Sequence, residues 1–142
     1  MNKKGFTLIE LLVVIAIIAL LSTLAVVALG SARKKANDAK RLSDLKQIQT
    51  ALELHYTDKN AYPTGASLTL GTASSSCLNA SGFGLTDCLD PYMGQVPKDP
   101  GNNSYVYTMS TSSYTIVATL ESGAGNLQAG AVVASPSGIK NQ

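Results

Sequence analysis

The apolar residues of this chain follow two different patterns, one after the other. From Phe6 to Leu29 almost every residue is apolar, and Glu10 is the only charged one among these twenty-four residues. A helix of this length can cross the hydrocarbon core of a bilayer, which needs roughly 20 apolar residues. A charged side chain inside such a segment costs on the order of 2.5–3.5 kcal/mol on insertion scales, so Glu10 needs a partner.

Beyond Gly30 the apolar residues recur at intervals of three and four, which is the stripe of an amphipathic helix. Asn60 and Pro63 are stop signals, since proline disfavours helix at the residue before it. The pattern predicts one helix over about 6–58, apolar on all sides over 6–30 and amphipathic over 31–58. The stripe consists of Leu42, Leu45, Ile48, Leu52 and Tyr56.

The rest of the chain predicts a globular head over 59–142. Residues 59–103 are rich in glycine, proline and serine and predict loops, and residues 135–142 predict a tail. Between them, 105–109 and 114–120 alternate in polarity and are rich in aromatic and β-branched residues, as strands are, and a third run covers 130–134.

We therefore predict an α+β fold, in which the amphipathic part of the helix packs on an antiparallel meander of about three strands within 104–134. Tyr105, Tyr107 and Met109 form one candidate inward face of the first strand, and the opposite set of residues forms the other.

Two cysteines, Cys77 and Cys88, lie within the predicted loop region. In a head exported across a membrane they would meet an oxidising compartment, and their even number favours a disulfide between them. Such a bridge would stabilise the loop region by about 2–3 kcal/mol on the chain-entropy account. The alternative is two unrelated buried thiols.

The charge distribution argues against a nucleic-acid-binding protein. Residues 61–142 carry two lysines against four acidic residues, whereas a nucleic-acid-binding domain should show a basic stripe on its surface. The positive charge instead gathers after the apolar segment, where we expect it to face phospholipid head groups. The residues concerned are Arg33, Lys34, Lys35, Lys40 and Arg41.

Residues that could carry catalysis or bind a metal are sparse. His55 is the only histidine, and neither a Cys-x-x-Cys pair nor a second histidine accompanies it, which argues against zinc. No serine or cysteine has a base positioned beside it in the sequence. Asp87, Asp90 and Asp99 carry the oxygen ligands that calcium prefers, but turn formation suits them better. We therefore predict a protein that is not an enzyme and needs neither cofactor nor metal.

The residues around Glu10 match a known signature. The segment KGFTLIE at 4–10, followed by an apolar run, resembles the class III signal of type IV pilins and of the pseudopilins of type II secretion. An ordinary secretory signal would have an apolar core of about 7–15 residues and no glutamate. In the pilin family a prepilin peptidase cuts after the glycine and methylates the new amine.

The resemblance implies a leader over 1–5, a cut between Gly5 and Phe6, and an N-methylated Phe6. It also implies that Glu10 pairs with the Phe6 amine of a neighbouring subunit during filament assembly. Because the new amine would lie four residues from Glu10 on the same helix, a pairing within one chain stays open.

As a function, the resemblance implies a structural subunit of a type IV pilus-like filament that assembles through its N-terminal helix. Its partners would be identical or related subunits, the prepilin peptidase, an inner-membrane assembly platform and, before assembly, the lipid bilayer. The precursor would cross the inner membrane once with its head outside the cytoplasm, and the filament would be extracellular or periplasmic.

Two other functions stay open. One is a pseudopilin of a type II secretion or DNA-uptake machine. Major pseudopilins of type II secretion hold calcium in an acidic C-terminal loop, but the segment after Glu121 contains no acid, so that site is not carried over. The other, from a different class, is a membrane-anchored monomeric adhesion or sugar-binding module.

Overall fold

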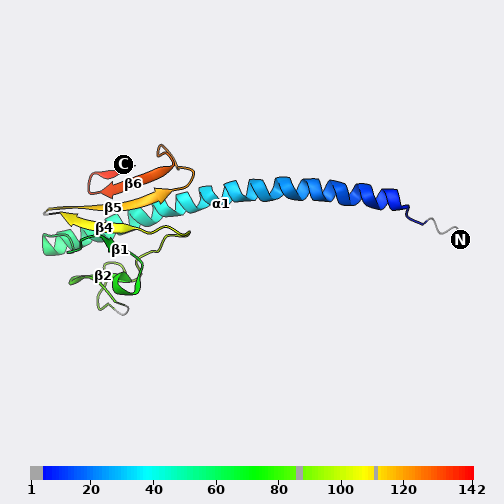
Figure 1. Ribbon diagram of the computed structural model, residues 1–142. Coiled ribbons are helices and arrows are strands. Elements are labelled where there is room, and N and C mark those ends of the chain that lie inside the picture. The colour runs from blue at the N-terminus through cyan, green and yellow to red at the C-terminus, as the bar shows by residue number, and fades with distance from the viewer. Residues whose placement is uncertain (1–4, 86–87, 111) are drawn as a thin grey trace. The chain divides into compact units, whose positions relative to one another are not determined.

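The computed structural model describes residues 5–85, 88–110 and 112–142. Residues 1–4, which make up most of the predicted leader, lie outside the described residues, as does Asp87. The chain forms two compact units, Met1–Lys34 and Lys35–Gln142. One long helix, α1 (Leu8–Lys59), contributes to both (Figure 1).

In the first unit, the apolar part of α1 exposes its side chains on every side. Phe6 is 88% exposed, and the large apolar side chains from Leu8 to Leu29 are exposed as well. By length and composition, α1 is the one helix of the described residues that could cross a membrane. The hydroxyls of Ser22 and Thr23 donate to carbonyl oxygens of the preceding turn, each at 2.7 Å. These two polar side chains therefore need no outside partner.

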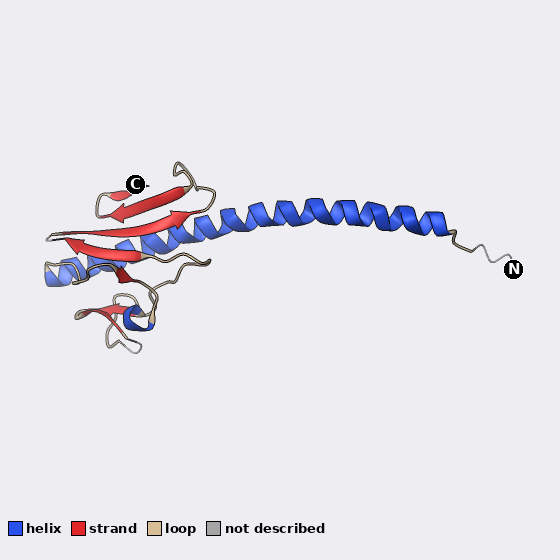
Figure 2. Cartoon of the chain, viewed as in Figure 1, coloured by secondary structure: helices blue, strands red, loops and turns tan. Residues whose placement is uncertain are grey.

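In the second unit, the amphipathic part of α1 packs against a five-stranded antiparallel sheet with strand order β1-β4-β5-β6-β7 (Figure 2). The strands are β1 (Leu68–Thr69), β4 (Val106–Ser110), β5 (Ser113–Leu120), β6 (Gly130–Ser135) and β7 (Gly138–Asn141). A separate two-stranded sheet pairs β2 (Cys77–Asn79) with β3 (Gly82–Gly84), after the short 3-10 helix η1 (Ala73–Ser75).

The predicted α+β fold is confirmed, but the prediction of about three strands is wrong. Strands β4, β5 and β6 lie where the three strands were predicted. The two further strands are the sheet edges: β1 lies in the predicted loop region and β7 in the predicted tail. β1 has two residues, and β7 begins at Gly138, whose φ of +126° favours glycine. Such short edge strands are too brief to show a period of two.

The core between helix and sheet follows the predicted stripe. Leu45, Ile48 and Leu52 of α1 are fully buried, and so are Tyr105 and Tyr107 from the sheet side. Met109, the third residue of that predicted inward face, is partly buried against the same cluster. The register with the tyrosines inward is therefore the one that the structure adopts.

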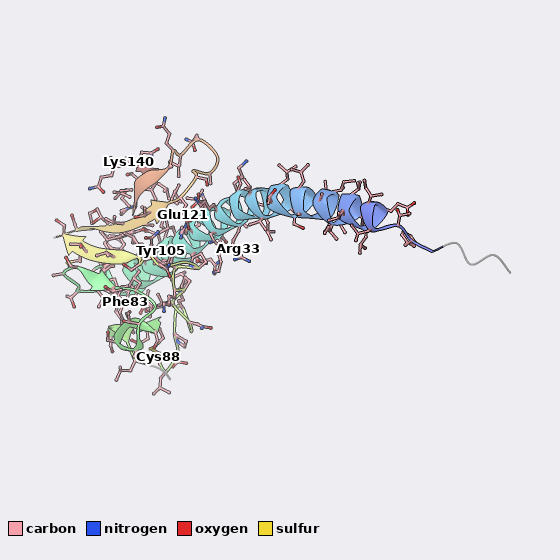
Figure 3. The ribbon with its side chains drawn as sticks, turned by 45° about the vertical axis from the view of Figure 1, so that its right-hand side comes forward. Arg33, Phe83, Cys88, Tyr105, Glu121 and Lys140 are labelled. Carbon is pink, nitrogen blue, oxygen red and sulfur yellow. A yellow bond between two sulfur atoms is a disulfide. The ribbon has the colours of Figure 1, made fainter. Side chains whose placement is uncertain are left out.

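A disulfide joins Cys77 of β2 to Cys88, with 6.2 Å between the two Cα atoms (Figure 3). The closed loop includes β3. Leu78 and Phe83 within this loop also pack against the core cluster, so the covalent link adds to noncovalent contacts that already hold the segment.

The burial difference between two leucines of α1 gives a stability prediction. Leu52 is fully buried, whereas Leu54 is 50% exposed. We expect Leu52→Ala to lower the free energy of unfolding of the head by about 2–5 kcal/mol, because it opens a cavity in the core. Leu54→Ala should change it by less than about 0.5 kcal/mol. Urea denaturation of the full chain in detergent, followed by near-ultraviolet circular dichroism, measures both; equal losses would contradict this core.

Candidate assembly site

Glu10 lies in the first turn of α1 and is held by Thr7, which precedes the helix. The backbone N–H and the hydroxyl of Thr7 both donate to Oε2 of Glu10, at 2.8 and 2.6 Å. In return, the backbone N–H of Glu10 lies 3.3 Å from the Thr7 hydroxyl oxygen. This reciprocal arrangement is a capping box, in which two side chains satisfy free N–H groups at a helix start.

The capping box supplies hydrogen bonds to only one of the two carboxylate oxygens of Glu10. Both contacts go to Oε2 of Glu10, and the other oxygen accepts no hydrogen bond within the described residues. Nor does any cationic group of the described residues lie within 4.0 Å of Glu10. Thr7 therefore supplies dipoles but no counter-ion.

The surface beside Glu10 is apolar and slightly hollowed. A shallow depression of about 390 Å³ is lined by Phe6, Ile9, Glu10, Val13 and Val14. The Gly5–Phe6 bond lies before the helix, and both residues are exposed. The structure thus brings the three predicted residues Gly5, Phe6 and Glu10 into one exposed N-terminal region.

The head contains a second group of charges, centred on Arg41, whose side chain is completely buried. Its Nε and Nη2 donate to the two carboxylate oxygens of Asp99, at 2.6 and 3.0 Å. Its Nη1 lies 2.8 Å from Asp38 and 2.9 Å from Glu121. Gly101 leaves room for the guanidinium, because a Cβ there would lie 2.9 Å from Nη2 of Arg41.

Asp38 ties the segment after β5 to α1. Its carboxylate accepts the backbone N–H groups of three consecutive residues, Glu121, Ser122 and Gly123, at 2.9, 2.7 and 3.0 Å. Gly123 has a φ of +88°, which favours glycine. A neighbouring contact of the same kind joins Asp44 to the Tyr105 hydroxyl, at 2.9 Å.

These contacts decide the charge state of two of the buried acids, Asp38 and Asp99. Burial alone would raise the pKa of Asp38, but the backbone N–H groups of Glu121 and Ser122, together with Arg41, outweigh it and lower the pKa. Burial would likewise raise the pKa of Asp99, but the hydrogen bonds from Arg41 outweigh it and lower the pKa. Both carboxylates therefore stay ionised around the guanidinium.

The expectation that Arg41 faces phospholipid head groups is wrong, because its charge is enclosed by acids. Lys40 is half exposed but pairs with Asp44 at 3.0 Å. The spacing of Asp38 and Arg41, three residues apart on a helix, was a usable sequence signal. Nothing local indicated Asp99, fifty-eight residues from Arg41 along the chain.

The other residues considered for chemistry have structural contacts. The Nδ1 of His55, which is buried, lies 2.8 Å from the Ala61 carbonyl oxygen, just beyond the end of α1. Asp90 has a φ of +45°, as a turn-forming aspartate does. Asp99 is engaged with Arg41. The capping box was missed by the sequence analysis, although the Thr-x-x-Glu spacing at 7–10 signals it.

Comparison with known proteins finds a family match for each of the two parts of the chain, the N-terminal helix and the head. Residues 1–30 match the family model of the prokaryotic N-terminal methylation motif, and residues 28–134 match that of type II secretion system protein G. The chain belongs to the type II secretion system protein G family. No solved structure matches it.

The relatives of this protein G family member include two kinds of protein. The type II secretion system core protein G of Escherichia coli is 32% identical over 74% of this chain and 71% of its own length. The core protein G of Aeromonas hydrophila is 32% identical over 73% of this chain and 71% of its own length. The type IV wide pilus major component PilA4 of Thermus thermophilus is 43% identical over 51% of this chain and 57% of its own length.

The buried charges predict a stability that depends on pH. Because folding lowers the pKa of Asp38 and Asp99, their contribution is complete well above the ordinary aspartate value of about 3.9. It is lost as the pH falls through that value toward the lower pKa values of the folded state. We expect the free energy of unfolding of the head to fall steeply below about pH 5, and the slope to be shallower in Arg41→Met.

At neutral pH we expect Arg41→Met to cost about 3–5 kcal/mol, because it leaves buried carboxylates without their counter-ion. Lys46→Met is the matched control; this lysine of α1 is exposed and has no ion pair among the described residues, so its loss should cost less than about 0.5 kcal/mol. Urea denaturation at a series of pH values measures both variants. Similar losses in the two would contradict a central role for Arg41.

Proposed function

We propose that this chain is a structural subunit of a type IV pilus-like filament, cleaved between Gly5 and Phe6 and assembled through α1. The observation that carries the proposal is the exposed apolar helix surface that contains one carboxylate without a counter-ion among the described residues. Such a surface is not left in water, and in lipid its carboxylate still needs a partner.

The partner that we propose for Glu10 is the amine of Phe6 in a neighbouring subunit. Cleavage after Gly5 would create this amine, and its positive charge would complete the half-satisfied carboxylate. The apolar depression beside Glu10 could receive the first residues of that neighbour. A pairing within one chain would satisfy Glu10 equally but would not favour polymerisation. We therefore assign the assembly role to the pairing between chains.

A second candidate is a pseudopilin of a type II secretion or DNA-uptake machine. It is favoured by the match of residues 28–134 to the protein G family and by the core protein G relatives. The pilus subunit is favoured by the relative PilA4, which is a pilus component. The segment after β5 also differs from the acidic calcium loop of major pseudopilins, because Asp38 and Arg41 hold it from α1.

The monomeric adhesion or sugar-binding module is not favoured, since the relatives named above belong to secretion systems or pili. In the proposed function, the partners are related subunits, the prepilin peptidase and an inner-membrane assembly platform. The precursor would cross the inner membrane once, with the head outside the cytoplasm.

Processing can be tested by mass spectrometry of protein purified from its native host. We expect the chain to begin at Phe6 and to carry one methyl group on its amine. The control is a strain that lacks prepilin peptidase, in which the chain should still carry residues 1–5. A mature protein that retains Met1 in the wild-type host would overturn the proposed processing.

The assembly role predicts that Glu10→Gln abolishes filaments. Glutamine keeps the size of the side chain and an oxygen that Thr7 can cap, but it removes the charge that attracts the amine. Electron microscopy and the amount of sheared surface protein measure assembly, with an expected loss of at least about tenfold if the pair contributes about 1.4 kcal/mol or more. Lys46→Gln, an exposed change elsewhere on α1, is the control.

The same strains separate the two candidate functions. Surface filaments in the wild type that disappear in Glu10→Gln support the pilus subunit. A defect in protein secretion, in a wild type that shows no surface filaments, supports the pseudopilin instead. Normal filaments in Glu10→Gln would refute the electrostatic account of assembly for both.

A further inference from the structure

Three consecutive cations, Arg33, Lys34 and Lys35, follow the apolar segment of α1 after only three intervening residues. We call them the cationic collar. All three side chains are exposed, and Arg33 projects from the helix surface (Figure 3). The two cations that follow them are paired with acids: Lys40 with Asp44 of α1, and Arg41 with Asp99 of the head.

The cationic collar has no counter-ion within the part of the chain that the structure describes. No carboxylate of these residues lies within 4.0 Å of Arg33, Lys34 or Lys35. Asp38 would be the usual partner of Lys34, four residues away on the helix. Its carboxylate is instead buried with Arg41 and three backbone N–H groups. Because Asp38 is engaged in these contacts, the three positive charges of the collar have no carboxylate partner among the described residues.

The directions of the three side chains argue for a ligand that surrounds the helix. Successive residues of an α-helix point about 100° apart, so the collar covers about 200° of the helix circumference. A folded protein that docked on one side would meet only part of it. The head-group layer of a bilayer encloses a spanning helix on all sides.

The position of the collar along α1 also places it at the depth of the head-group layer when the apolar segment spans the hydrocarbon core. With a rise of about 1.5 Å per residue, the collar begins about 6 Å beyond Leu29 and ends about 9 Å beyond it. The head-group region adds about 5–8 Å to each side of the hydrocarbon core. Long lysine and arginine side chains reach back toward this layer while their stems cover apolar surface.

We propose that the cationic collar binds the phosphate groups of anionic phospholipids in the leaflet at that end of the spanning segment. The proposal rests on the membrane-inserted precursor of the proposed function, and it requires no filament. Each collar residue would hold lipid phosphate by charge, so lysine and arginine are interchangeable there. A subunit that leaves the membrane must first exchange these lipids for other partners.

The test is reconstitution of the full chain into phosphatidylcholine vesicles that contain spin-labelled lipids. Electron paramagnetic resonance gives the fraction of labelled lipid immobilised by the protein. We expect phosphatidylglycerol to associate about fivefold more strongly than phosphatidylcholine, the ratio that about 1 kcal/mol per surface cation would give for one engaged site. The preference should fall strongly between about 0.05 and 0.5 M salt, since salt screens charges at a surface.

Matched variants assign the preference to the collar. In the triple variant Arg33→Gln, Lys34→Gln and Lys35→Gln, the ratio should fall to about one. A control that removes three exposed lysines outside the collar, Lys46, Lys98 and Lys140, changes the net charge equally and should keep the preference. Arg33→Lys should keep it as well. Circular dichroism checks that helix content is unchanged in each variant.

Two outcomes would overturn the proposal. One is an undiminished preference for phosphatidylglycerol in the triple variant. The other is a wild type that immobilises both lipids without any preference for phosphatidylglycerol. If the wild type immobilises neither lipid, the membrane-inserted precursor itself is refuted, which separates that failure from failure of the collar.

Discussion

One continuous helix lies in two different surroundings, an apolar one over its first part and a head domain in water over its second. This constraint governs the rest of the structure. Over Phe6–Leu29 the chain is apolar on every side, which suits lipid or the interior of a filament. From Asp38 to His55 the helix buries one face against a sheet and exposes the other. The change occurs across Gly30 without a break in α1, although glycine inside a helix costs about 1 kcal/mol relative to alanine.

Charged groups along α1 show what the fold completes by itself and what it leaves for partners. Arg41 is enclosed by Asp38, Asp99 and Glu121, so its charge is matched within one chain. Glu10, in contrast, has only dipoles from Thr7 among the described residues. The head shows that this chain can surround a charge with counter-ions where it needs no other molecule. The proposed pairing of Glu10 with the amine of a neighbouring subunit would supply the counter-ion that the described residues do not.

The sequence predicted the features that depend on local periodicity. The spacing of Leu45, Ile48 and Leu52 located the buried face of α1, and the alternation around Tyr105 and Tyr107 located the central strands and one of their two possible registers. The signature at residues 4–10 pointed to the family that the comparisons then identified.

The features that could not be predicted from the sequence depend on distant parts of the chain. Strands β1 and β7 form because a neighbouring strand offers them hydrogen bonds, and their own residues carry little pattern. Arg41 looked like one cation of a basic cluster, because Asp99 and Glu121 approach it only in the folded head.

The proposed sites at the two ends of the apolar segment act on membrane extraction in opposite directions. A carboxylate in hydrocarbon raises the free energy of the inserted subunit, and so Glu10 favours departure toward a neighbour that offers an amine. Phosphate contacts at the cationic collar lower the free energy of the same inserted state and oppose departure. Each of these charge contributions is small beside that of the apolar surface of residues 6–29, which has to find other apolar partners when the subunit leaves the bilayer. The two charges therefore need not be close together to act on one step, because both contribute to the stability of the same inserted helix.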